Sequence, residues 1–461
     1  MHIAVIGSGY VGVVTGSVFA EIGHRVACFD VDGEKVQQLR SGCVPFFEPG
    51  LSELIRHYGS NGHLRFSDVV GECVADAEAI LLCVGTPPEP DGRADLSQVF
   101  AAARQAAPWL RRGAVVTVKS TVPVGTCDEV ERIVRRHAAC HPVYVASNPE
   151  FLAEGEAVAN ARQPYRVVIG ANEPEAAEVL RRLYSNVSSP LLVTDRRTAE
   201  LIKHASNAFL ATKISFVNTL AILCDKAGAD VRAVARGMGL DPRVGAQFLQ
   251  AGLGYGGSCF PKDCRSMLHV AAQFGCQFDI VAAAISVNEG MVDYVLGRMA
   301  DALGSLRGKT VAVLGLSFKP NTSDVRESQA VAAARRCLEH GARVRAHDPV
   351  AVEAAQAILP GVVYCENVYE CVRGADAVLL ATAWEQYRQL DLPHVARLMR
   401  GAHVFDGRNF LSARCVAQAG LQYHGVGQGQ PGPEVADVKS RAAAWAPHIS
   451  TSPTPVQIPS T

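Results

Sequence analysis

The stretch from Gly254 to Asp263 reads G-Y-G-G-S-C-F-P-K-D and combines glycines with a cysteine and two charged residues. Glycine lets the backbone enter left-handed conformations and approach a ligand closely, and it weakens helices and strands. Cys259 lies in this stretch, with Lys262 and Asp263 three and four residues later. A nearby ammonium favours the thiolate, which is the nucleophilic form of cysteine. A lone cysteine is more often a small buried hydrophobe, but the charged flank and the glycines indicate a nucleophile on a loop that contacts a ligand.

The N-terminus has the arrangement of a dinucleotide-binding unit. Residues 2–7 predict a buried strand that runs into G-S-G-Y-V-G, whose glycines are Gly7, Gly9 and Gly12. A helix follows, and then a second strand, Arg25 to Phe29, ends at Asp30, which is 23 residues after Gly7. Such glycines bring backbone N–H groups to a pyrophosphate, and an acid at this spacing holds a ribose 2′-hydroxyl. Because a carboxylate repels a 2′-phosphate, the motif favours NAD over NADP.

Further short apolar strands each end beside polar residues. The predicted strands are Ala79–Val84, Val115–Val118, Val143–Ala146 and Val167–Ile169. Their alternation with helical stretches predicts a parallel sheet covered by helices on both faces, whose ligands gather at the carboxyl ends of the strands. Thr86, Thr121, Glu150 and Glu154 follow those ends. Each alone would be interpreted as a turn residue or a helix cap, but together they indicate a site.

The middle of the chain is predicted to be helical. Apolar and small residues recur at three- and four-residue steps from Leu201 to Thr219, which predicts one long helix from Ala199 to about Ala227. Lys203 and Asn207 are four residues apart and therefore share a face of that helix. A solvated lysine face is the commoner outcome for such a pair. A long helix between two α/β halves is also a natural dimerisation surface.

A second α/β half follows. Its predicted strands are Lys309–Gly315, Arg343–His347, Ala377–Thr382 and His403–Asp406. It has only Gly315 where the first half has three glycines, so we expect it to bind a different nucleotide. Lys319, Arg326 and Arg408 follow strand or turn signals and could reach phosphates. From Gly427 onward Gly, Pro, Ser and Thr dominate, which predicts a disordered tail.

Length, charge and cysteine usage narrow the class of protein. The 461 residues are too many for one core. The net charge of −1 gives no indication of a nucleic-acid or membrane partner. No secretory signal and no uninterrupted apolar stretch of about 18 residues stands out. The 14 cysteines form no C-x-x-C pair, so we expect no metal site, no disulfide framework and a cytoplasmic location.

These segments predict an α/β protein with two Rossmann-like, doubly wound parallel-sheet domains joined by a helical segment with a long central helix. We place an NAD-binding domain at residues 1–195 and a central helical, dimerisation segment with the cysteine loop at 196–303. A second Rossmann-like domain is expected at residues 304–426, and the disordered tail at 427–461. A cysteine beside an NAD site is informative, because oxidation of an alcohol needs no covalent nucleophile. A thiolate is useful when an aldehyde is oxidised further: it adds to the carbonyl, the thiohemiacetal gives a hydride, and water hydrolyses the thioester.

Eight motifs stand in order along the chain: G-S-G-Y-V-G, C-V-G-T-P, D-G-R-A-D-L-S, K-S-T-V-P-V-G-T, S-N-P-E-F-L-A-E-G, A-E-L-I-K-H-A-S-N-A, G-Y-G-G-S-C-F-P-K-D and S-F-K-P-N-T. With them, residues 1 to about 425 resemble the UDP-glucose/GDP-mannose dehydrogenase family. The resemblance implies a four-electron oxidation in which UDP-glucose, two NAD and water give UDP-glucuronate and two NADH. The A-E-G after N-P-E-F-L and the spelling of the cysteine loop favour UDP-glucose. GDP-mannose and UDP-N-acetylhexosamines are the alternatives, because the same catalytic residues would serve.

The resemblance also implies roles for individual residues. It makes Cys259 the nucleophile and Lys203 the ammonium that stabilises oxyanions, with Asn207 and Asp263 as the partners of Lys203 in orienting substrate and water. Glu150 would be the carboxylate of thioester hydrolysis, and Thr121 would help to hold the water. The implied NAD contacts are Gly7, Gly9, Val11, Gly12, Asp30, Lys35, Thr86, Thr121, Glu154, Lys262 and Arg326. The implied sugar-nucleotide contacts are Glu150, Phe151, Leu152, Glu154, Lys203, Asn207, Arg243, Phe248, Leu249, Gln250, Ala251, Gly252, Gly256 and Lys319. The third segment would bind the UDP sugar. In this family Arg243 often reaches in from the neighbouring subunit, which implies a homodimer or a larger homo-oligomer.

The chain departs from the family pattern at four positions, none of them a proposed catalytic group: Ser323, Gln329, Thr219 and Ala383 stand where an acid, a proline, a glutamate and a glutamate are usual.

Two rival functions remain. A two-electron β-hydroxyacid dehydrogenase shares the N-terminal half and a long helix, but it has no need of Cys259 and yields one NADH per substrate. An inactive NAD-binding sensor would not need to retain Cys259, Lys203, Glu150 and Asp263 together.

Overall fold

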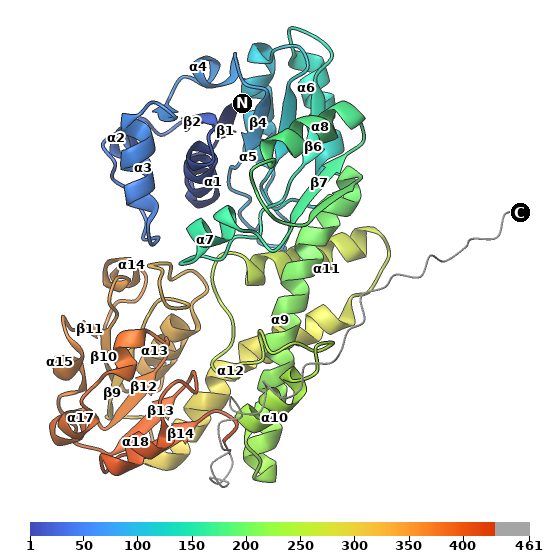
Figure 1. Ribbon diagram of the computed structural model, residues 1–461. Helices are drawn as coiled ribbons and strands as arrows, with labels where there is room; N and C mark the ends of the chain where they lie inside the picture. Colours follow the sequence, from blue (N-terminus) through green and yellow to red (C-terminus); the bar gives the residue numbers. More distant parts are fainter. Residues whose placement is uncertain (429–461) are drawn as a thin grey trace, which may run out of the picture.

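In the computed structural model two α/β domains lie at opposite ends of the molecule, and long helices run between them (Figure 1). The structure describes residues 1–428. The predicted tail was placed from Gly427 onward, but Gly427 donates its N–H to Asp225 and Gln428 forms a β-bridge with Asp230. The end of the described residues is thereby fastened to the central helices. The rest of the predicted tail, 429–461, lies outside the described residues.

The N-terminal domain is built on an eight-stranded sheet with strand order β3-β2-β1-β4-β5-β6-β7-β8. The strands are β1 (His2–Ile6), β2 (Arg25–Phe29), β3 (Leu64–Ser67), β4 (Ala79–Leu82), β5 (Val115–Val118), β6 (Tyr144–Ser147), β7 (Val167–Ala171) and β8 (Leu191–Thr194). All neighbours are parallel except β6 and β7, which pair antiparallel, so the sheet is mixed at that one junction. Its first six strands have the order of a dinucleotide-binding sheet.

Helices cover both faces of this sheet, and each face has its own hydrophobic core. The helices are α1 (Tyr10–Glu21), α2 (Gly33–Arg40), α3 (Leu51–Ser60), α4 (Val70–Val74), α5 (Ser97–Ala106), α6 (Thr126–His137), α7 (Ala157–Arg162) and α8 (Pro174–Leu183), with a 3₁₀ turn at Ala107–Trp109. The central strands β4 and β5 are buried on both sides, which explains why they are continuous apolar runs and do not alternate.

The central segment consists of α9 (Arg196–Ala227), α10 (Val231–Gly239), α11 (Phe260–Gln273) and α12 (Asp279–Leu303). The side chain of Asp195 accepts from the N–H of Thr198 and caps α9, and Gly228 ends that helix in a left-handed conformation. The long helix predicted from Ala199 to Ala227 thus starts one turn earlier. Helices α9 and α12 are long and apolar enough to cross a membrane, but they pack against each other and α11, as core helices do.

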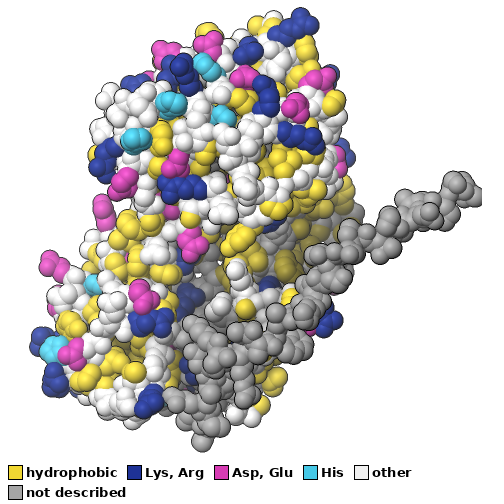
Figure 2. Space-filling view, viewed as in Figure 1, with side chains coloured by type: hydrophobic (Ala, Val, Ile, Leu, Met, Phe, Trp, Pro, Cys, Tyr) yellow, Lys and Arg dark blue, Asp and Glu magenta, His cyan; other side chains and the backbone are white. Residues whose placement is uncertain are grey.

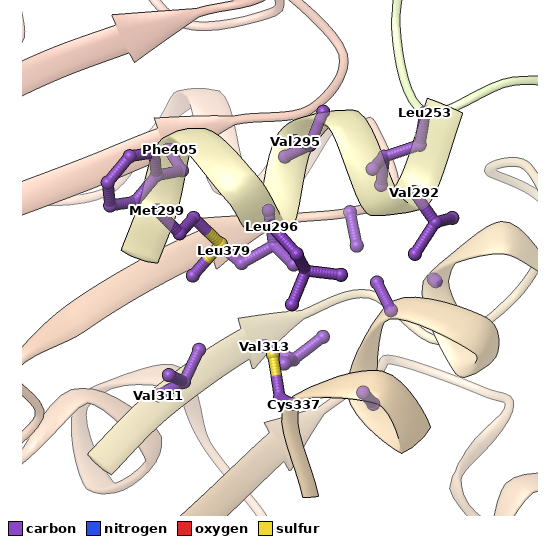
Figure 3. Packing of buried hydrophobic residues seen from close by; sticks show 14 of the residues in the cluster. Leu253, Val292, Val295, Leu296, Met299, Val311, Val313, Cys337, Leu379 and Phe405 are labelled. Carbon is purple, nitrogen blue, oxygen red and sulfur yellow. The ribbon is translucent and has the colours of Figure 1, made fainter. Parts of the chain in front are cut away.

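The C-terminal domain repeats the layout of the first, with strand order β11-β10-β9-β12-β13-β14 and parallel pairing throughout the sheet. The strands are β9 (Thr310–Leu314), β10 (Arg343–His347), β11 (Val363–Tyr364), β12 (Ala377–Leu380), β13 (His403–Asp406) and β14 (Gln422–Gly425). The helices are α13 (Gln329–Glu339), α14 (Val352–Gln356), α15 (Val368–Val372), α16 (Glu385–Arg388), α17 (Leu392–Leu398) and α18 (Ala413–Gln418). Helices α12 and α13 cover one face of this sheet, where their apolar side chains form a common core with β9, β12 and β13 (Figure 3).

Candidate active site

Cys259 lies at the junction of a glycine-rich loop and a helix. The loop ends at Ser258, Cys259 is the N-cap of α11, and Lys262 and Asp263 belong to the first turn of that helix. Lys262 and Asp263 were expected on a loop, whereas in the structure they belong to a helix that begins at Phe260. A helix N-terminus favours an anion, so this position stabilises a thiolate.

The loop before Cys259 is fixed by groups from three other elements. Asn288 of α12 accepts from the N–H of Tyr255 at 2.8 Å and donates to its carbonyl oxygen at 3.1 Å. Gln329 at the start of α13 donates to that same carbonyl oxygen at 3.1 Å. Leu253 inserts into the core between α12 and the second sheet (Figure 3). The cysteine is therefore presented by a rigid support.

Arg408, expected as a phosphate ligand, also supports this loop. Its guanidinium donates to the carbonyl oxygens of Gly254 at 2.8 Å and Ala381 at 2.7 Å. Burial lowers the pKa of Arg408 to about 10. The guanidinium joins the end of β12 to the cysteine loop, which is a structural role.

Lys203 and Glu150 form a buried ion pair beside Cys259. The ammonium of Lys203 lies 3.1 Å from Glu150, and both side chains are almost fully buried. Lys203 comes from α9 and Glu150 from the segment after β6, so the pair joins the helical segment to the first sheet. The ring of Phe151 lies 5.3 Å from the same ammonium.

Asn207 and Asp263 extend this polar cluster. The amide of Asn207 donates to Asp263 at 2.6 Å, and the ammonium of Lys262 binds the other carboxylate oxygen at 2.6 Å. Burial of Asp263 raises the pKa of its carboxyl, but Lys262, His204 and Lys203 together outweigh burial, so the pKa is lowered. Lys203 and Asn207, four residues apart on α9, therefore share a face as their spacing predicts, and this face is buried in the cluster and not solvated.

The electrostatics of Cys259 differ from the expectation drawn from Lys262. Burial raises the pKa of the Cys259 thiol, and the carboxylates of Glu150 and Asp263 raise it further. The ammonium that opposes this rise is that of Lys203, whereas Lys262 is bound to Asp263. Proximity in sequence thus pointed to the wrong lysine.

A cavity of about 690 Å³ lies between the first sheet, the cysteine loop and the segment before α13. Its lining includes Gly9, Val11, Thr86, Thr121, Glu150, Leu152, Glu154, Cys259, Lys262, Asp263 and Arg326. Nine of the proposed catalytic and cofactor residues thereby line the same cavity as the thiol. The volume is that of a cofactor site.

The glycines at the entrance to α1 fit a dinucleotide. Gly7 has a φ of +100°, and a Cβ on Gly12 would overlap the carbonyl oxygen of Gly7, so neither position accepts a larger residue. At the end of β2, Asp30 accepts from the N–H of Ser8 at 2.8 Å and binds the ammonium of Lys35 at 3.2 Å. The turn and its acid have the geometry that a pyrophosphate and a ribose require.

The other wall comes from the C-terminal domain. Glu154 accepts from Ser258 at 3.2 Å and from Thr322 at 3.1 Å, and it lies 3.8 Å from the guanidinium of Arg326. Burial raises the pKa of Glu154, whereas burial lowers the pKa of Lys319, which faces Glu154. Lys319 is therefore directed at the same cluster without lining the cavity.

Some predicted contacts lie away from the cavity. Gly252 and Gly256 pack tightly against Gly407 and Glu327, and Phe248 has a φ of +64° and lies near Phe260. The segment with Leu249, Gln250 and Ala251 follows it, and the carbonyl oxygen of Ala251 accepts from Asn409, which comes after β13. Arg243 is exposed and paired with Asp241, so within one chain it does not reach the site.

One supporting residue was missed by sequence reasoning. Glu48 is buried and accepts from the hydroxyl of Tyr10 and from the N–H groups of Gly155 at 2.6 Å and Ala157 at 2.7 Å. It thereby holds the loop after Glu150 against the N-terminal glycine turn. The available signal was an acid inside the otherwise apolar run V-P-F-F-E-P-G-L.

No cluster of three or more His, Cys, Asp or Glu that could hold a metal occurs within residues 1–428. The charged and reactive groups of the site are its thiol, its ammonium groups and its carboxylates.

Comparisons with known proteins agree with this geometry. Residues 1–188 match the NAD binding domain of the UDP-glucose/GDP-mannose dehydrogenase family, 197–290 its central domain, and 312–413 its UDP binding domain. A UDP-glucose 6-dehydrogenase of Bacillus subtilis is 45% identical over 431 residues, which cover 93% of this chain and 98% of that protein. The structure of a UDP-glucose dehydrogenase from Pyrobaculum islandicum has a TM-score of 0.87 at 45% identity and covers 92% of this chain and 97% of its own. A UDP-D-ManNAc dehydrogenase from Pyrococcus horikoshii has a TM-score of 0.83 at 28% identity and covers 93% and 100%.

Proposed function

Because the chain belongs to the UDP-glucose/GDP-mannose dehydrogenase family, we propose that it is an NAD-dependent oxidoreductase that converts UDP-glucose into UDP-glucuronate. The observation that carries the proposal is the placement of Cys259 on the wall of the dinucleotide cavity, beside the Lys203–Glu150 pair. NAD is the cofactor of the family, and when bound it accepts hydride.

The chemistry of this chain's residues follows from their positions. C6 of the sugar loses a hydride and a proton to become an aldehyde, and the Cys259 thiolate then adds to the aldehyde carbon. The ammonium of Lys203 stabilises the oxyanion of this thiohemiacetal. Departure of a second hydride leaves a thioester, and water attacks it to release the carboxylate and the thiol.

Glu150 serves the hydrolysis step. Its carboxylate, adjacent to the cavity and bound to Lys203, accepts a proton from the attacking water. Thr121 lines the same cavity and holds that water, while Asn207 binds Asp263, which in turn holds Lys262. The overall reaction consumes two NAD and one water and yields two NADH and protons.

The cofactor contacts are proposed as Gly7, Gly9, Val11, Gly12, Asp30, Lys35, Thr86, Thr121, Glu154, Lys262 and Arg326. The sugar nucleotide is proposed to lie between the segment after Glu150, the Phe248–Gly252 segment and Lys319 of the UDP binding domain. UDP-glucose is favoured over UDP-N-acetylhexosamines, since identity is 45% to UDP-glucose dehydrogenases and 28% to the UDP-D-ManNAc enzyme. A cytoplasmic location stays a prediction.

We also propose a homodimer or larger homo-oligomer formed through α9. Phe209, Phe216 and Leu223 recur every seven residues on one side of this helix and are 65%, 53% and 59% exposed. Figure 2 shows further hydrophobic side chains on the surface near the middle of the molecule. A second copy would cover an apolar face of this kind. It would also bring Arg243, which is exposed here, to a neighbouring site.

The decisive test counts reduced cofactor. The protein is incubated with NAD and separately with UDP-glucose, GDP-mannose and UDP-N-acetylglucosamine, and NADH is measured against sugar consumed. We expect two NADH per UDP-glucose and formation of UDP-glucuronate. Cys259→Ser should fold and bind UDP-glucose but form no acid. One NADH per sugar, or acid formation at the wild-type rate by Cys259→Ser, would exclude the covalent mechanism.

A further inference from the structure

An ion pair joins the two walls of the cofactor cavity outside the catalytic cluster. Arg265 of α11 binds Glu327 through both of its terminal nitrogens, at 3.2 and 3.3 Å. Both residues line the cavity, Arg265 from the helix that starts at Cys259 and Glu327 from the segment before α13. None of the catalytic steps above uses either side chain.

Glu327 has a strained backbone. Its φ is +50°, a left-handed conformation that is costly for a residue other than glycine or asparagine and persists only where its surroundings hold it. Two contacts hold it: the N–H of Gly257 donates to the carbonyl oxygen of Arg326 at 2.9 Å, and the Arg265 guanidinium binds the Glu327 side chain. The turn is thus fastened both to the cysteine loop and to α11.

Arg265 also touches the N-terminal domain. Residues 87–95 form a small hairpin with a bridge between Pro88 and Ala94, and a Cβ on Gly92 would lie 3.3 Å from the Cβ of Arg265. Pro87 and Pro88 at its base line the cofactor cavity. Three parts of the chain that line the cavity therefore meet at this one arginine.

We infer that Arg265 is a positioning residue for the cofactor: its ion pair with Glu327 holds the Arg326–Glu327 turn in the left-handed conformation and so keeps the Arg326 guanidinium at the cavity. Arg326 lies beside Glu154, and its own side chain is tied to Asp324 at 2.6 Å, so its place depends on the path of this turn. Other charged or polar groups that face Arg265 are Glu289 of α12 and Tyr255.

This inference rests on the proposed use of NAD but not on the identity of the sugar. Removal of the pair should weaken NAD binding while the catalytic groups stay in place. For Arg265→Ala and Glu327→Ala we expect the Kd of NAD, measured by calorimetry without any sugar nucleotide, to rise about two- to fivefold. KM for NAD should rise in parallel, with kcat within about twofold of the wild type.

The pair can be separated from a general loss of stability. The double variant Arg265→Ala/Glu327→Ala should be no weaker in NAD binding than either single variant, because the two residues act as one unit. Arg265→Lys and the exchanged pair Arg265→Glu/Glu327→Arg should recover part of the affinity. The matched control is Arg132→Ala, which removes an exposed ion pair with Glu129 on α6 and should leave NAD affinity unchanged.

Unchanged NAD affinity in Arg265→Ala, or additive effects in the double variant, would overturn the inference. So would a fall in kcat at constant KM, because that result would make Arg265 part of the chemistry. If the wild type binds NAD as expected but does not oxidise UDP-glucose, the proposed substrate fails while this inference is still tested by the affinities.

Discussion

At the scale of single residues, the reactivity of Cys259 depends on three charged neighbours, of which one is positive and two are negative. Lys203 lowers the pKa of the thiol, and Glu150 and Asp263 raise it together with burial. Lys203 and Glu150 are also bound to each other, so each partly neutralises the effect of the other. The charge state of this pair therefore determines how readily the thiolate forms.

This arrangement predicts that two variants shift the pKa of Cys259 in opposite directions. Glu150→Gln removes a negative charge and should lower the pKa of Cys259, so alkylation by iodoacetamide should become fast at a lower pH than in the wild type. Lys203→Met removes the opposing positive charge and should move the same profile to higher pH. Because Cys43, Cys276 and Cys415 are exposed as well, the modified peptide is quantified by mass spectrometry. Shifts in the same direction for both variants would contradict this account.

Sequence reasoning proposed residues that the fold brings together, but it did not identify all of their partners. Cys259, Lys203, Glu150 and Asp263 were identified from motifs and are brought together, because strand ends and a long helix direct them to one place. Lys262 was given the role of Lys203, since distance along the chain is visible in a sequence and distance across the fold is not. Glu48 has no local signature, because its donors at Gly155 and Ala157 lie more than a hundred residues away.

At the scale of elements, the cysteine loop is defined by what it packs against. Asn288 binds Tyr255, Leu253 is part of the core under α12, and the backbone of Gly256 lies against the carbonyl oxygen of Glu327. The loop thus has no free space on its inner side. Its glycines are needed for contact with the neighbouring chain segment as well as for any ligand.

Gly256→Ala should therefore be costly. The added methyl group would overlap backbone atoms of Glu327, which cannot move without shifting the turn that carries Arg326. We expect kcat/KM to fall by about a hundredfold, since a displacement of about 1 Å at an active site has that effect. The control is Gly297→Ala in α12, where nothing lies within 4 Å. There the stability measured by urea unfolding should rise by about 0.5–1 kcal/mol.

Element prediction succeeded where the pattern was long and failed at sheet edges. The long helix α9 was found to within one turn because its apolar period extends over many residues. The strands β3, β8, β11 and β14 were not predicted, and each lies at an edge of its sheet. Edge strands are paired on one side only, so they lack the continuous apolar run that identifies a central strand.

At the scale of the whole molecule, two sheets lie on either side of the cysteine loop, and the first six strands of the N-terminal sheet have the same order as the six of the C-terminal sheet. The carboxyl ends of both sheets supply polar groups, and the central helices set their separation. Asp225 strengthens this arrangement by binding Tyr294, Arg298 and the N–H of Gly427, so that the end of the C-terminal domain is fastened to α9 and α12. The proposed catalytic groups meet within one chain, whereas Arg243 of that chain is exposed and paired with Asp241.

Mixing two inactive variants tests whether Arg243 acts in a neighbouring subunit. In a symmetric dimer each site would combine Cys259 of one chain with Arg243 of the other. A heterodimer of Cys259→Ser and Arg243→Ala chains then has one fully native site and one doubly defective site. After unfolding and refolding of an equal mixture, about a quarter of the wild-type activity should return, since half of the dimers are mixed and half of their sites are native. If Arg243 serves its own chain, every site in the mixture is defective and no activity returns, which would remove the argument that the active site is completed by a second copy.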